Sequence, residues 1–158
     1  MTHSDKRGMS LIVRTVCRGL AGFVLLYGVY VVAYGHLSPG GGFAGGVIAA
    51  CAFVMILLAE GTASAQRVFS RAAASTLDSL GVLLFWFVAG LGLLVAGTYF
   101  ANLGATPTDA HYALFSGGSI PVANLGIGLK VCSSLYLVVG VLSAFRLGST
   151  PRDEGGDP

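Results

Sequence analysis

The chain has 158 residues, of which 54% are hydrophobic and only 10% are charged, with a formal net charge of +2. Soluble domains carry about a quarter charged residues, so this composition excludes an ordinary soluble domain and indicates a membrane protein. The small positive charge gives no reason to expect a nucleic-acid partner.

Four predominantly apolar segments are each long enough to cross a bilayer as a helix, which takes about 20 residues. No strand-like alternation of polar and apolar residues is present, so we predict an all-α, polytopic fold. A polar N-terminal segment (1–10) and a polar C-terminal tail (147–158) flank a four-helix membrane domain (11–146). The predicted helices cover about 16–34, 39–59, 80–100 and 122–145.

The distribution of cations predicts which ends face the cytoplasm. Lys and Arg residues precede or open the first helix, lie between the second and third, and follow the fourth, whereas the other two connections carry none. Because cytoplasmic loops are enriched in Lys and Arg, both termini are expected to be cytoplasmic. Residues 1–35 also resemble a signal peptide, but we expect them to be retained as the first span, since the charges require an even number of spans. These cations are Lys6, Arg7, Arg14, Arg18, Arg67, Arg71, Arg146 and Arg152.

The first two helices are joined by only about four residues, which predicts an antiparallel hairpin. His36 in this connection is expected to be solvated or capping, with a cation-facing role as the alternative. Ser38 is predicted to cap the second helix and Pro39 to open it.

The second helix is predicted to begin with a surface almost bare of side chains, which would let another backbone approach closely. We predict that this surface is a contact with another subunit. The spacing of its glycines also matches a dinucleotide-binding fingerprint. That pattern has meaning only after a strand in a βαβ unit, so we favour helix packing. This helix-packing motif consists of Pro39, Gly40, Gly41, Gly42, Gly45 and Gly46.

Asp78 is predicted to open the third helix. A carboxylate in a first helical turn is favoured by the helix dipole, and the competing role is an ion-pathway carboxylate at a boundary between subunits. In the outer loop 101–121, Asp109 and His111 are too few to hold a metal ion. The cysteines Cys17, Cys51 and Cys132 are widely spaced, so no metal or cofactor is expected.

Lys130 lies close to the middle of the fourth helix, where a lysine costs about 2.5–3.5 kcal/mol and should be paired or face a cavity. If the helix ends were level, Lys130 would lie beside Gly92, about 21 Å along the third helix from Asp78. Direct pairing with Asp78 is therefore not expected, and either a neighbouring subunit supplies the counter-ion or Lys130 faces water. On the second helix the same depth corresponds to about Ile48–Ala50.

The residues also resemble a known family. The stretch Tyr34–Gly46 (YGHLSPGGGFAGG) is similar to a G-H-x-x-P-G-G-G-F-x-G-G signature of the MnhB-like family, whose members are small subunits of Mrp-type cation/proton antiporters. Leu114–Gly118 (LFSGG) and Gly126–Val131 (GIGLKV) resemble later motifs of that family. Equivalent subunits also occur in membrane-bound hydrogenases and sulfur reductases.

The resemblance implies a small subunit of a multisubunit complex in a prokaryotic cell membrane that exchanges Na+ for H+. Its expected partners are other subunits, with Lys130, Asp78 and His36 as candidates for the ion pathway. The sequence shows no catalytic machinery of its own. An equivalent subunit in a redox-driven complex is the first alternative, and a self-contained homo-oligomeric transporter is the second.

Overall fold

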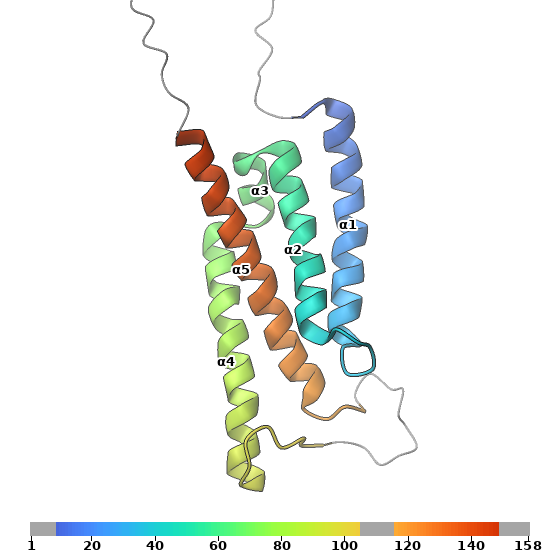
Figure 1. Ribbon diagram of the computed structural model, residues 1–158, viewed down its shortest axis with the longest axis vertical. Coiled ribbons are helices and arrows are strands. Elements are labelled where there is room, and N and C mark those ends of the chain that lie inside the picture. The colour runs from blue at the N-terminus through green and yellow to red at the C-terminus, as the bar shows by residue number, and fades with distance from the viewer. Residues whose placement is uncertain (1–8, 105–115, 149–158) are drawn as a thin grey trace, which may run out of the picture.

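The computed structural model describes residues 9–104 and 116–148 (Figure 1). Asp109, His111 and the first two residues of the Leu114–Gly118 motif lie outside the described residues, as do residues 1–8 and 149–158 of the polar ends.

The prediction of four membrane-spanning helices is confirmed. The long helices are α1 (Leu11–Ala33), α2 (Gly41–Glu60), α4 (Arg71–Ala96) and α5 (Ile120–Gly148), and all four contain spans apolar enough to cross a membrane. A further helix of 7 residues, α3 (Thr62–Val68), lies between α2 and α4.

The predicted start of the third long helix at residue 80 is wrong, because α4 begins at Arg71. The side chain of Ser70 caps the helix by accepting a hydrogen bond from the backbone N–H of Ala73 at 3.1 Å. The following Ala/Ser-rich residues favour a helix although they are not strongly apolar. The hydropathy boundary therefore marked where the apolar run begins rather than where the helix begins.

The predicted start of α2 at Pro39 is also wrong. The helix begins at Gly41, and Gly40 occupies the capping position with φ 123° and no side-chain cap. Gly41 itself has φ 56°. Backbone with such positive φ is open to glycine and rarely to other residues, so these two glycines form the turn and Pro39 precedes it.

The four long helices lie side by side in the order α1, α2, α5, α4, as Figure 1 shows. α1 packs chiefly on α2, α2 packs also on α5, and α4 packs chiefly on α5. α2 runs parallel to α5, whereas α1 and α4 run antiparallel to their neighbours. This arrangement is a row rather than a closed bundle, so in the described part of the chain the outer flanks of α1 and α4 are exposed.

The corner between α3 and α4 is tied to α5 by an aromatic cluster. Tyr136 Oη donates a hydrogen bond to the backbone oxygen of Phe69 at 2.8 Å. The Phe69 ring stacks on Phe53 of α2, with ring centroids 4.6 Å apart. These contacts hold the start of α4 against the middle of the row and so help to determine its register along α5.

Candidate functional site

An ion pair between α4 and α5 is the most distinctive feature inside the membrane-spanning part of the chain. Lys130 Nζ lies 2.6 Å from Asp78 Oδ2. The other carboxylate oxygen, Oδ1, accepts a hydrogen bond from Ser134 Oγ, one turn further along α5. The Lys130 side chain is 41% exposed and the Asp78 side chain is 24% exposed, so the pair is only partly covered by this chain.

Two glycines bring α4 and α5 close enough for the short aspartate side chain to reach the lysine. A Cβ atom on Gly81 would lie 2.7 Å from the carbonyl oxygen of Gly126 and 2.8 Å from the backbone nitrogen of Lys130. Real Cβ atoms do not approach backbone atoms that closely. Small residues at a membrane helix crossing permit this contact between backbones. The sequence patterns did not indicate Gly81.

The expectation that Asp78 and Lys130 do not pair is therefore wrong, because it assumed that the outer ends of the helices are level. Lys130 lies beside Gly81, not beside Gly92. Gly92 instead packs on the backbone of Thr98–Ala101, which folds back against α4. The outer end of α4 extends past the start of α5 (Figure 1), and this displacement brings Asp78 to the depth of Lys130.

The glycine-rich stretch meets helices of the same chain. A Cβ atom on Gly42 would overlap the backbone oxygen of Asn124 in α5, and one on Gly46 would lie 2.7 Å from the carbonyl oxygen of Gly128. On the other side, a Cβ on Gly45 would lie 2.7 Å from the backbone nitrogen of Val32 in α1. The prediction that this stretch is a contact with another subunit is corrected: α1 and α5 occupy it.

Asn124 of α5 lies against the first residues of α2. The sequence patterns did not indicate this residue. Its side-chain oxygen accepts a hydrogen bond from the backbone N–H of Gly42 at 3.4 Å. Because the first N–H groups of a helix have no partner within the helix, Asn124 supplies one for α2. A polar residue among the apolar residues of the fourth span was the only sequence signal for it.

His36 lies in the turn that follows α1, away from the ion pair. Its ring packs against Gly117, since a Cβ atom placed there would lie 3.0 Å from His36 Cδ2. The structure thus brings together two of the three ion-pathway candidates, Lys130 and Asp78, and places the third in the outer turn.

A second ion pair lies at the opposite end of α2. The guanidinium of Arg18 in α1 donates from Nε to Glu60 Oε1 at 2.8 Å and from Nη2 to Glu60 Oε2 at 2.6 Å. Glu60 is the last residue of α2. The sequence patterns indicated Arg18 only as a cation at the membrane boundary and Glu60 only as a helix end, with no pairing between them.

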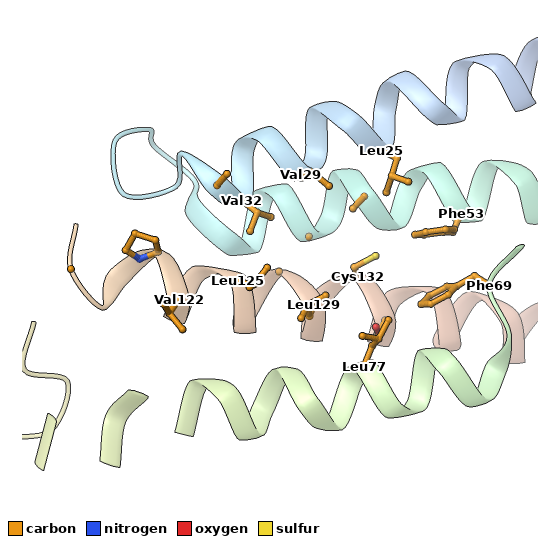
Figure 2. A pocket seen from close by; sticks show the side chains of 17 residues that line it. Leu25, Val29, Val32, Phe53, Phe69, Leu77, Val122, Leu125, Leu129 and Cys132 are labelled. Carbon is orange, nitrogen blue, oxygen red and sulfur yellow. The ribbon is translucent and has the colours of Figure 1, made fainter. Parts of the chain in front are cut away.

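An apolar groove of about 450 Å³ runs along one broad face of the row. Figure 2 shows Val29 and Leu25 of α1 and Phe53 of α2 on one side, with Leu129 of α5 and Leu77 of α4 on the other. Neither charged side chain of the Lys130–Asp78 pair lines this groove. Among the described residues, no group of three or more His, Cys, Asp or Glu side chains could hold a metal ion.

Comparison with known proteins agrees with the resemblance of the motifs. A family model described as a domain related to the MnhB subunit of Na+/H+ antiporter matches residues 12–137. An uncharacterized protein of Methanocaldococcus jannaschii is 30% identical over 140 residues, which cover 86% of this chain and 53% of that protein. A subunit of the Na(+)/H(+) antiporter of Bacillus subtilis is 33% identical over 93 residues, covering 59% of this chain and 57% of that one.

A solved structure has the same fold. It is a chain of the membrane-bound sulfane sulfur reductase, an archaeal respiratory membrane complex, with a TM-score of 0.69 and 30% sequence identity. The match covers 90% of this chain and 60% of that one, so this chain spans little more than half the length of these relatives. Four apolar helices and these matches show that the chain is a multi-pass membrane protein belonging to the MnhB family.

Proposed function

We propose that this chain is an accessory subunit of a multisubunit antiporter that exchanges a monovalent cation, Na+, for protons across a prokaryotic cell membrane. Its family and the name of the Bacillus subtilis relative support this. The chain packs against other small subunits and helps to form the cation route. In this role the chain catalyses no reaction of its own and uses no cofactor.

The observation that carries the proposal is the partly exposed Lys130–Asp78 pair, with its nitrogen–oxygen distance of 2.6 Å, inside the spans. Charged groups at this depth are costly, and those that occur commonly mark ion or proton pathways. The exposed sides of both groups lie open on a row of helices whose flanks carry large exposed apolar side chains, such as Phe23, Trp86 and Leu94. Neighbouring subunits would cover these flanks and complete the surroundings of the pair.

The orientation proposed for the chain follows from its cations: both termini and the α3 corner face the cytoplasm. Labelling of single cysteines introduced near Arg67 and into the 34–37 turn tests it. A membrane-impermeant thiol reagent applied from outside should react only at the turn. Reaction at Arg67 instead would reverse the topology.

The decisive functional experiment measures cation/proton antiport in everted membrane vesicles that contain the complex with Lys130→Ala. We expect a lower antiport rate or a weaker apparent cation affinity at unchanged assembly. Arg67→Gln, which removes a cation from α3 outside the pair, serves as the matched control. An unchanged rate and affinity in Lys130→Ala would leave the ion pair with a structural role only.

A second candidate function rests on the solved structure of the sulfur reductase complex. In that case the chain belongs to the ion-translocating membrane arm of a redox-driven complex. Purification through a tag on this chain separates the two functions. Co-purifying iron–sulfur subunits would favour the redox complex, whereas antiporter-like subunits without them would favour the antiporter.

A further inference from the structure

A pocket of about 560 Å³ opens at the end of the row where α1 begins and α2 ends. Three elements supply its polar lining: Arg14, Thr15 and Arg18 of α1, Glu60 of α2 and Ser64 of α3. We call it the arginine pocket. It lies on the side that is predicted to be cytoplasmic, far along the helices from the Lys130–Asp78 pair, and the proposed antiport function does not use it.

The Arg18–Glu60 pair holds one guanidinium in a defined orientation. Arg18 donates through Nε and Nη2, so the edge formed by Nη1 and the second hydrogen of Nη2 is turned away from the carboxylate. The Glu60 side chain is 6% exposed and the Arg18 side chain is 72% exposed. The carboxylate is therefore covered, while the outer edge of the guanidinium presents a fork of N–H donors that matches the oxygens of a phosphate.

The depth of the pocket corresponds to the headgroup layer of a bilayer. α2 has 20 residues and ends at Glu60, and 20 residues span about 30 Å, the thickness of the hydrocarbon core. Since Arg18 meets Glu60, the part of α1 before Arg18 extends about 10 Å beyond that boundary. Arg14, one turn before Arg18, therefore lies at the level of lipid phosphates.

Charge and apolar surface together indicate the ligand. The lining contains two guanidinium groups and one carboxylate, so the formal charges of the lining residues sum to +1. Leu11 also lines the pocket, and its side chain is 79% exposed. A basic pocket with an apolar edge at the cytoplasmic surface suits a lipid headgroup better than a free ion, because the ligand brings acyl chains of its own.

We propose that the arginine pocket binds the phosphate of an anionic phospholipid, with Arg18 as the fork, Arg14 as the second cation and Ser64 as a hydroxyl donor. Glu60 acts as a positioning residue that orients Arg18. The lipid would add a further link between the cytoplasmic ends of α1, α2 and α3, beside the Arg18–Glu60 pair.

The test uses the whole complex, purified through this chain and depleted of lipid in a neutral detergent. Its melting temperature is followed during titration with dioctanoyl phosphatidylglycerol, dioctanoyl phosphatidylcholine or inorganic phosphate. A ligand that binds the folded state raises the melting temperature with concentration. We expect phosphatidylglycerol to do so and the other two to have little effect at equal concentration.

Variants of the pocket localise the effect. Arg18→Gln combined with Glu60→Gln removes the fork without leaving an unpaired carboxylate, and Arg14→Gln leaves the ion pair intact. Each should weaken phosphatidylglycerol binding about tenfold, since each removes a charge-assisted contact. Arg67→Gln, a cation of α3 that does not line the pocket, should bind as the wild type does.

Three results would overturn the inference. Both pocket variants could bind phosphatidylglycerol as tightly as the wild type, or phosphatidylcholine could stabilise the complex equally. If inorganic phosphate raised the melting temperature as much as phosphatidylglycerol does, the ligand would not be a lipid. Arg14→Gln keeps the test interpretable even if the Arg18→Gln/Glu60→Gln complex fails to assemble.

Discussion

Removing only one member of the Lys130–Asp78 pair should cost more stability than removing both. Asp78→Asn leaves a lysine without its counter-ion inside the spans, which costs about 2.5–3.5 kcal/mol on insertion scales. Because the Lys130 side chain is 41% exposed, we take the lower end, about 2.5 kcal/mol, which corresponds to roughly a 70-fold shift in the folding equilibrium.

The double variant Asp78→Asn/Lys130→Met removes both charges and keeps the approximate side-chain volumes. Replacing a buried ion pair by neutral groups of similar size is often close to neutral. We therefore expect a loss below about 1 kcal/mol, and hence a coupling of more than about 1.5 kcal/mol between the two positions. Ser134→Ala, which removes only the hydrogen bond to Asp78, should cost about 1 kcal/mol.

The assay is equilibrium unfolding of the purified chain in mixed micelles titrated with sodium dodecyl sulfate. Trp86, the only tryptophan of the chain, lies on α4 and reports the separation of α4 from the row by its fluorescence. The reasoning would be refuted if the two single losses simply added in the double variant. In that case the close nitrogen–oxygen contact would carry no coupling energy.

Further predictions concern the close helix crossings and the second ion pair. Gly46→Ala should lower the melting temperature by the equivalent of about 1–3 kcal/mol, because its Cβ would meet a carbonyl of α5 and overpacking has that cost. The control Gly90→Ala should be neutral or stabilising, because its Cβ would meet nothing within 4 Å. Equal losses in the two variants would contradict the packing. Gly81→Ala should destabilise the fold as Gly46→Ala does and also lower antiport by separating α4 from α5, whereas unchanged unfolding would show that the crossing is loose. Glu60→Gln should lower the melting temperature, and adding Arg18→Gln should restore part of the loss; a further loss in the double variant would mean that Arg18 is stabilised by something other than Glu60.

Much of the fold was determined by the sequence alone. Apolar segments of the required length predict four spans, and the short connection at Gly35–Ser38 predicts the antiparallel hairpin of α1 and α2. Both inferences rest on local quantities, namely hydropathy and chain length, which do not depend on how the helices are arranged. The depth expected for Lys130 on α2 also agrees, because Gly46 packs against Gly128 and Val131 in the parallel helix α5.

The tertiary structure alone decided which residues meet. Hydropathy placed the start of α4 too late because the Ala/Ser-rich turns after Ser70 are helical without being strongly apolar. The assumption that the helix ends are level then placed Asp78 out of reach of Lys130. In the structure, α4 is shifted along α5, and Lys130 Nζ lies 2.6 Å from Asp78 Oδ2. That shift depends on the contact between Gly81 and Gly126 and on the ties at Phe69. These contacts join residues far apart in the chain, and no local pattern encodes such a register.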